Sequence, residues 1–566
     1  MGQMRGMLRN GVCVVAGMLL WSSAYAQIAS PSQTLKQTVP DERNAEHAPL
    51  PGQTAPPDQG MKEMADPGQP VMLHSLSVTG STVFSDADFS PLYADLVGKE
   101  TTTGALNGVA QAIRNMYRDA GYVFTRTALN VDGSGAAQIT VVEATIGAVT
   151  VEEPSGPIGP VKSLLMRMGD RLVGMKNPRL ADLERVLLLM NDVPGITRAT
   201  AVPRPGQNAG EVDLFVNVER DAFSGAVFAD NRQSPVIGRG SAGVQLNLDS
   251  YTSMGDSTQF TYVNSFGDDD KLDLDERYLG EISHQHCFGS SGLVGKARFL
   301  YGRTRPGDVL TPLDLEGEQL EAEVQLEYPL KRTRRLSIWV NGGFEYRNVK
   351  NEVLGGAATL SDDKLRIAAI GARVLERDSL GYTEGLIEVR QGLDVLGASD
   401  SNHDLTSRFD GKNDFTLLRL EINRDLQLTH GFSLFLKGAG QVSKDALLAS
   451  EEFNAGGSTF GRGFDPSEIT GDHGIGGTAE LRYTNQFQIK GYQTGYQVYG
   501  FTDAAKVFNK GDGQPDSDQL VSVGGGVRLD LPLDIQLGGE VAVPLQELKR
   551  NDERNVLFLF NIVKRF

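Results

Sequence analysis

Most of the chain after residue 219 alternates apolar and polar residues, which is the period of a β-strand with two different faces. Leu320 to Leu330 alternates almost strictly, and Leu533 to Val543 places its apolar side chains opposite Asp534 and Glu540. Counting such segments predicts about 16 antiparallel strands, an even number of the kind found in bacterial single-chain barrels. The strands are expected near residues 222, 240, 257, 275, 293, 320, 335, 364, 383, 415, 432, 476, 495, 520, 534 and 556.

Charged residues occupy the polar face of many of these strands, as Arg419 and Glu421 do between Leu418 and Ile422. A soluble sandwich would have to bury one face of each sheet, and long open sheets would leave unpaired edges. A closed barrel in lipid satisfies every backbone group and keeps a wet, polar interior. The pattern therefore favours a transmembrane β-barrel, with a soluble sandwich as the alternative.

The chain before the barrel shows two rounds of a β-α-α-β-β pattern at about 75-residue spacing, which indicates tandem small α+β domains. In the first round the clearer helix runs from Ala105 to Ala120, with apolar residues on one face and Gly121 as its stop. In the second, helices are expected at Val161 to Met168 and Arg179 to Met190. We assign residues 71–146 and 147–219 to the two domains and residues 220–566 to the barrel, with a long inserted loop at 446–475.

The first 26 residues have the form of a secretory signal: a basic start, an apolar run and Ala24-Tyr25-Ala26 as the cleavage site. Residues 27–70 are rich in proline and glutamine and predict a linker, with a possible short plug helix over 32–38. Cleavage leaves Cys287 as the single thiol, so no internal disulfide is expected. With Arg5 and Arg9 removed from the 54 basic residues, 52 face 72 acidic ones, a net charge of −20 that argues against a nucleic-acid partner.

One motif stands out inside the predicted barrel: Phe460-Gly461-Arg462-Gly463-Phe464. An arginine between two glycines is unusual in a loop beside a membrane. It becomes sensible if the loop folds back into the barrel and meets a carboxylate there. Asp503, in Phe501-Thr502-Asp503, is the candidate carboxylate.

Taken together, the linker, the two repeated units, the barrel and this motif resemble the outer-membrane transporters of two-partner secretion, the TpsB family. The units are similar to POTRA domains, as in Ile139 to Ala144 at the end of the first and Leu188 to Gly195 in the second. The resemblance implies that Arg462, Gly463 and Phe464 reach into the lumen and pair with Asp503 on the thirteenth strand.

Two positions in the motif depart from the family pattern. Gly461 stands where the family often has an aliphatic residue, and Ala505 replaces the last glycine of the motif that begins at Phe501. Neither change removes a charge, so the expected pairing is retained. The pair braces the loop as a lock, stabilises the barrel, or does both.

The resemblance also implies the function. We expect a Gram-negative outer-membrane pore whose periplasmic POTRA domains, within residues 71–219, bind an unfolded haemolysin- or adhesin-like β-helical exoprotein. The sequence contains no phosphate-binding Gly-x-x-x-x-Gly-Lys-Ser/Thr loop, so client folding outside the cell is the expected driving force. Outer-membrane lipid and the barrel assembly machinery, which would read the C-terminal Phe566, are the other expected partners, and no cofactor is expected.

Weaker signals leave other chemistry open. His284, His286 and Cys287 could ligate zinc, but alternate strand residues face opposite sides, so an incidental cluster is favoured over a metal site. His473 with Asp472 could suggest acid-base catalysis, but no nucleophile motif lies nearby, and we expect no enzyme. The remaining alternatives are a factor that assembles other barrels, which two repeats rather than a longer array disfavour, and a diffusion porin, which would lack periplasmic domains.

Overall fold

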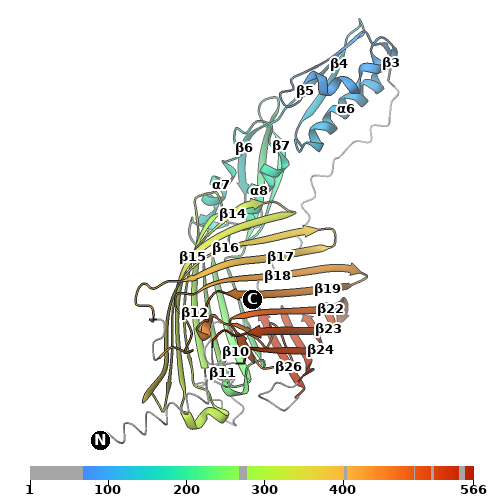
Figure 1. Ribbon diagram of the computed structural model, residues 1–566. Helices are drawn as coiled ribbons and strands as arrows, with labels where there is room; N and C mark the ends of the chain where they lie inside the picture. Colours follow the sequence, from blue (N-terminus) through green and yellow to red (C-terminus); the bar gives the residue numbers. More distant parts are fainter. Residues whose placement is uncertain (1–67, 267–276, 401–404, 490, 512–514, 547–554) are drawn as a thin grey trace, which may run out of the picture.

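A computed structural model describes residues 68–266, 277–400, 405–489, 491–511, 515–546 and 555–566 (Figure 1). The expected signal segment, the short helix at 32–38 and nearly all of the linker lie outside these residues. No helix in the described part of the chain is both long and apolar enough to cross a membrane.

The first small unit is a three-stranded sheet in the order β2-β5-β4, covered by one long helix. Its helix α6 begins where the Thr102 hydroxyl accepts a hydrogen bond from the Ala105 amide, and it ends before Gly121, whose φ of 94° suits glycine. The first of the two expected helices shortens to α5 and two single turns. The elements are β1 (Pro70–Met72), β2 (Ser75–Thr79), α5 (Asp86–Phe89), η1 (Ser90–Leu92), η2 (Ala94–Leu96), β3 (Glu100–Thr102), α6 (Thr103–Asp119), β4 (Arg126–Val131) and β5 (Ala136–Val142).

The second unit repeats this topology as β6-β8-β7, and in both units the first and last strands pair in parallel. Because β6 begins at Thr145, the second unit starts before the predicted boundary at residue 147. Its core packs the two helices against the sheet through Leu164, Leu189 and Val216. The elements are β6 (Thr145–Glu152), η3 (Gly159–Val161), α7 (Lys162–Gly169), α8 (Leu180–Asn191), β7 (Ile196–Pro205) and β8 (Glu211–Arg220).

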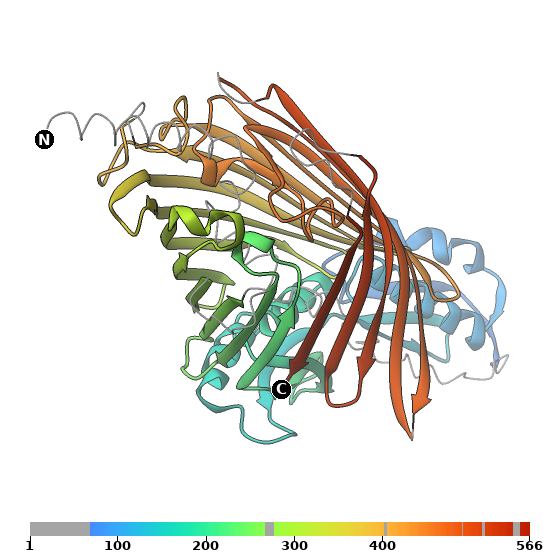
Figure 2. The same cartoon turned by 90° about the horizontal axis from the view of Figure 1, so that it is seen from below.

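The rest of the described chain forms a closed antiparallel barrel of 16 strands, which confirms the predicted number. Figure 2 shows the last strand, in dark red, closing against the first, in green, and β26 pairs with β9 through residues 561–565. The strands are β9 (Phe223–Asp230), β10 (Gly240–Asp249), β11 (Ser257–Phe266), β12 (Arg277–Phe288), β13 (Leu293–Thr304), β14 (Glu316–Arg332), β15 (Leu336–Val353), β16 (Ala358–Asp378), β17 (Gly381–Gly392), β18 (Thr416–Thr429), β19 (Phe432–Ser443), β22 (His473–Ile489), β23 (Tyr492–Phe508), β24 (Ser517–Leu531), β25 (Ile535–Pro544) and β26 (Leu557–Arg565). Among the described residues, its connections contain the 3-10 helices η4 (Pro235–Ile237) and η5 (Asp308–Leu313), and a third between β19 and β22.

The apolar and polar residues that alternate in the sequence lie on opposite faces of the barrel wall. On β18, Leu418, Leu420 and Ile422 are 41–51% exposed on the outside, whereas Arg419 points inward to Gln441 of the neighbouring strand and to Glu451. On β14, Val324 points outward. The outer face is therefore apolar and the lumen is charged, which is the arrangement that lipid outside and water inside require.

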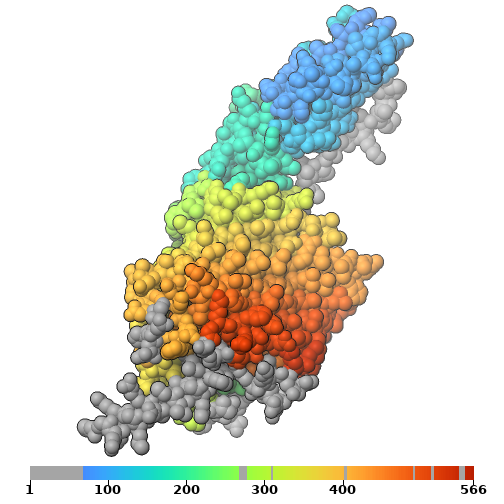
Figure 3. All heavy atoms as spheres, viewed as in Figure 1, coloured from blue at the N-terminus to red at the C-terminus, as the bar shows by residue number. Residues whose placement is uncertain are grey.

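The two small units and the barrel form one elongated arm and body (Figures 1 and 3). The second unit sits directly on the barrel, where Arg332 of β14 donates two hydrogen bonds to Asp192, at 2.8 and 2.5 Å. Arg220 also donates to the backbone carbonyl of Asp249, and Cys287 of β12 joins the apolar core of the second unit. These contacts place the second unit at one end of the barrel, and Figure 1 shows the first unit extending beyond it.

Candidate functional site

The connection between β19 and β22 folds back into the barrel instead of projecting from it. It spans residues 444–472, slightly earlier than the predicted 446–475, because β22 already begins at His473. We call these residues the inserted loop. It contains η6 (Ala449–Glu451) and a small hairpin of β20 (Phe453–Ala455) and β21 (Ile469–Gly471). Its apolar residues pack on the inner wall, where Phe460 lies in one buried cluster with Val507 and Leu520.

At the tip of the inserted loop, Arg462 contacts three carboxylates of the wall. Its Nε and Nη2 donate to the two oxygens of Asp503 at 3.0 and 2.9 Å, and its backbone amide donates to the same side chain at 3.0 Å. Its Nη1 donates to Glu480 at 2.8 Å and to Glu540 at 3.3 Å. The Arg462 residue is only 7% exposed. The structure thus brings together the arginine and the aspartate that the sequence singled out, and adds two further acids.

Strand register explains why these groups meet. Glu480 of β22 lies opposite Phe501 of β23, and Asp503 follows two residues later on the same face. The guanidinium carbon of Arg462 lies 3.4 Å from the centroid of the Phe501 ring, a cation–π contact beneath the ion pairs. Phe501 is therefore part of the same site as Asp503.

At both glycines of the motif, neighbouring atoms leave no room for a side chain. Gly461 has a φ of 98°, and a Cβ there would lie 2.4 Å from Leu520 Cδ1. A Cβ on Gly463 would lie 2.8 Å from the backbone nitrogen of Pro544. Between these close approaches, the Phe464 amide donates to the Gly461 carbonyl at 2.9 Å and closes a tight turn. This explains the departure at Gly461: an aliphatic side chain would not fit this backbone.

Charged contacts also hold the two ends of the inserted loop. Asp472 accepts hydrogen bonds from Arg408, which lies between β17 and β18, and from the amides of Leu447 and Lys510. His473 accepts a hydrogen bond from the Ser443 amide across the base of the loop. Asp472 and His473, the pair that could have suggested acid-base chemistry, are thus engaged in fixing the loop.

The other candidate cluster, on β12, is divided between two faces. His284 forms a hydrogen bond of 2.9 Å with Thr258, and the His286 ring lies 4.2 Å from that of Phe288. Cys287 points away from both histidines into the apolar core beneath the second unit. Among the described residues, no group of three or more potential ligands is placed to hold a metal ion.

The two small units meet at a carboxylate. Glu143, which follows β5, accepts hydrogen bonds from Thr82, Tyr117 and Asn177, the last of these in the second unit. Partial burial alone would raise the pKa of Glu143, but the hydrogen bonds from Thr82, Tyr117 and Asn177 lower it to about 2. The carboxylate is therefore charged at neutral pH and fixes the junction.

Sequence reasoning missed the partners that come from distant strands. Glu540 was predicted to lie on the polar face of its strand, but no nearby motif indicated a contact with Arg462, which is 78 residues away in the sequence. Glu451 was not singled out at all, although it is fully buried in the lumen. The one available signal was an acidic residue inside a segment expected to fold inward.

Comparison with known proteins agrees with this architecture. The family model of the haemolysin secretion/activation proteins ShlB/FhaC/HecB matches residues 210–529, more than half of the chain, and that of the ShlB-type POTRA domain matches residues 71–144. The heme/hemopexin transporter protein HuxB of Haemophilus influenzae is 22% identical over 498 residues, covering 85% of this chain and 84% of HuxB.

Solved structures show the same fold. CdiB from Escherichia coli has a TM-score of 0.72 at 18% identity, covering 96% of this chain and 98% of CdiB. BamA from Haemophilus ducreyi lacking its POTRA domains 1–3 has a TM-score of 0.51 at 13% identity, covering 87% of this chain and all of that one. The family match, the barrel and the POTRA units agree: the chain belongs to the haemolysin secretion/activation family, the TpsB transporters that export partner proteins in two-partner secretion.

Proposed function

We propose that this transporter accepts its exoprotein unfolded, through the two POTRA units in the periplasm, and passes it through the lumen after the inserted loop has moved aside. The single observation that carries the proposal is the Arg462 site, because it holds a loop inside the path that a client must take. The family's pore function establishes that a partner protein is exported. The route and the moving part are our inference.

The POTRA sheets are suited to binding an extended chain. In the described part of the molecule, β2 and β4 of the first unit and β7 of the second each pair on one side within their sheets. An unfolded client can add to such an edge through backbone hydrogen bonds, with little demand on its sequence. Because the second unit is seated on the barrel, a client bound there would lie next to the lumen.

A client must be unfolded to pass. A barrel of 16 strands admits an extended or hairpin segment but no folded domain, and the inserted loop reduces the free space further. The sequence has no nucleotide-binding motif, so the proposed drive is folding of the exoprotein on the far side. A haemolysin- or adhesin-like β-helical client fits this drive, since its repeats can fold one after another as they emerge.

Three further assignments belong to this proposal. The mature chain resides in the outer membrane with its POTRA units in the periplasm, and residues 1–26 direct its export. The C-terminal Phe566, which is 51% exposed and whose ring lies beside that of Phe223, is the residue that the barrel assembly machinery would read. Arg462, Gly463, Phe464, Phe501 and Asp503 form the lock that keeps the loop in place at rest.

The proposal is tested by co-expressing the chain, with and without residues 71–219, beside an exoprotein encoded next to it, and following that exoprotein between periplasm and medium. Export that requires residues 71–219 is the expected result. Export that continues without them would contradict recognition by the POTRA units. Retention in both cases, with other barrels failing to assemble when the chain is depleted, would favour a role in barrel assembly instead.

A further inference from the structure

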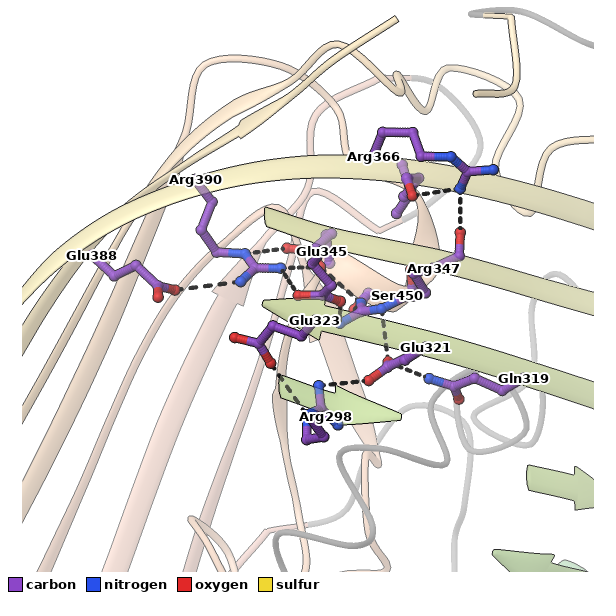
Figure 4. A network of polar contacts seen from close by, with 12 residues as sticks. Arg298, Gln319, Glu321, Glu323, Glu345, Arg347, Arg366, Glu388, Arg390 and Ser450 are labelled. Carbon is purple, nitrogen blue, oxygen red and sulfur yellow. Dashed lines mark hydrogen bonds and ion pairs between the residues drawn. The ribbon is translucent and has the colours of Figure 1, made fainter. Parts of the chain in front are cut away.

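A second charged cluster grips the inserted loop far from its tip. Glu451, at the end of η6, is fully buried and accepts hydrogen bonds from three arginines of the barrel wall. Arg347 of β15 donates to it at 2.7 Å, Arg390 of β17 at 3.1 Å and Arg419 of β18 at 3.2 Å. Figure 4 shows Arg347 and Arg390 converging near Ser450, the neighbour of Glu451. We call Glu451 and these arginines the Glu451 cluster.

The same wall residues also hold the backbone of the loop. Arg347 donates to the carbonyl of Ser450 at 3.1 Å, and Arg419 donates to the carbonyl of Glu451 at 3.2 Å. Gln441 of β19 donates to the Glu451 carbonyl as well, at 2.9 Å. Main chain and side chain are thus fixed together, so the ascending limb of the loop, residues 446–452, has little freedom to shift.

The Glu451 cluster and the Arg462 site lie on different strands of the barrel wall, and their wall residues carry opposite charges. The Glu451 cluster offers arginines from β15, β17 and β18 to an acidic residue of the loop. The tip site offers acids from β22, β23 and β25 to Arg462. Shifting the loop towards either group of strands would bring like charges together, so the charge pattern specifies one seating of the loop.

We propose that Glu451 is a second positioning residue of the inserted loop, which holds its ascending limb against β15, β17 and β18 independently of Arg462. The anchoring role itself does not depend on the proposed function, but its consequence for transport does. If Arg462 is released during transport, the tip of the loop can move while residues 446–452 stay fixed. The loop would then open as a flap hinged near Glu451 and would not leave the lumen as a whole.

The test measures exposure of the limb directly, without any client. Ser450 is 3% exposed, so we replace Ser450→Cys as a reporter in a chain that also carries Cys287→Ala. The purified mature chain, which has lost Cys13 with the signal segment and keeps both POTRA units, is treated in detergent micelles with a water-soluble maleimide, and the labelling rate of position 450 is measured. Heat-modifiable mobility on gels verifies that each variant has a folded barrel.

Three substitutions are compared in this background. Glu451→Gln removes the loop's charge from the cluster. Glu388→Gln is the matched control, because Glu388 contacts the same Arg390, at 3.5 Å, but belongs to the wall strand β17. Arg462→Gln releases the tip alone.

We expect Glu451→Gln to raise the labelling rate about tenfold or more, since a buried ion pair that loses one partner is strongly destabilised. Glu388→Gln and Arg462→Gln should leave it within about twofold. The proposal would be overturned if Glu451→Gln were labelled at the same rate as its parent, or if Glu388→Gln raised the rate equally. A faster labelling of position 450 in Arg462→Gln would show that the limb is not held independently of Arg462.

A second variant keeps the test decisive if Glu451→Gln does not fold. Arg419→Gln removes one of the three donors and should raise labelling by a smaller factor; no rise would count against the cluster as an anchor. Because no exoprotein is present, a failure here is separate from a failure of the secretion assay.

Discussion

Replacing Arg462 by alanine removes the contact on which the proposed lock depends. The side chain forms two hydrogen bonds with Asp503, contacts Glu480 and Glu540, and stacks on Phe501. Removing one partner of a buried ion pair costs about 3–5 kcal/mol, and we use the lower end because the lumen admits water. At about 1.4 kcal/mol per factor of ten, 3 kcal/mol lowers the ratio of seated to displaced tip by about a hundredfold.

Single-channel recording in planar bilayers measures this ratio as the time that the channel spends closed divided by the time that it spends open. Arg462→Ala should open far more often than the parent chain while its barrel stays folded and inserted. In cells the same variant should release less exoprotein, because the tip no longer returns to one seated position between transport events.

Arg482→Ala is the matched control for this experiment. Arg482 also contacts Glu480, at 2.6 Å, but it belongs to the wall strand β22 and not to the loop. Its loss should change opening much less than the loss of Arg462. Undiminished export and unchanged opening by a properly inserted Arg462→Ala variant would refute the reasoning, as would an equal effect of Arg482→Ala.

Three other outcomes are expected. Glu143→Gln should weaken the POTRA junction by about 1–2 kcal/mol, seen as about 5–30-fold faster hydrogen exchange in α6 of the intact chain at pH 7. Because the pKa of Glu143 is lowered from 4.5 to about 2, its contribution is present above pH 4.5 and is lost as pH falls towards 2; Glu143→Gln should lack this dependence. Arg332→Ala should loosen the second POTRA unit on the barrel and speed exchange in α8 about tenfold, since the partly exposed pair with Asp192 is worth about 1–2 kcal/mol; unchanged exchange would argue against a fixed junction. Phe566→Ala should lower the amount of folded barrel in the outer membrane, measured on immunoblots, although the purified chain still folds; a normal amount would remove this residue as an assembly signal.

The barrel and its strand number were predictable because lipid and water impose opposite demands on alternate residues. Leu418 and Arg419 illustrate this: one faces outward and the other faces the lumen. The repeated units were predictable for a similar reason, since the apolar face of α6 follows the helical period. Boundaries were less accurate, as at Thr145 and His473, because local pattern does not specify the residue at which pairing begins.

The contacts of the inserted loop were only partly predictable. Arg462 and Asp503 could be paired from their motifs, but Glu480 and Glu540 joined them through strand register and closure of the barrel, which combine residues far apart in the chain. The partners of Glu451 could not be predicted for the same reason, because they lie on three strands and none is its neighbour in sequence. Ion pairs between residues so far apart in the sequence can be identified only once the fold is known.

The most direct test of the central claim is transport in a purified system. The chain is reconstituted in lipid vesicles with its POTRA units outside, the unfolded exoprotein is added without any nucleotide, and protease then removes whatever has not entered. We predict that the exoprotein becomes protected inside vesicles that carry the full chain and stays accessible when residues 71–219 are missing. An exoprotein that stays accessible with the full chain, or that enters only when nucleotide is supplied, would contradict the account.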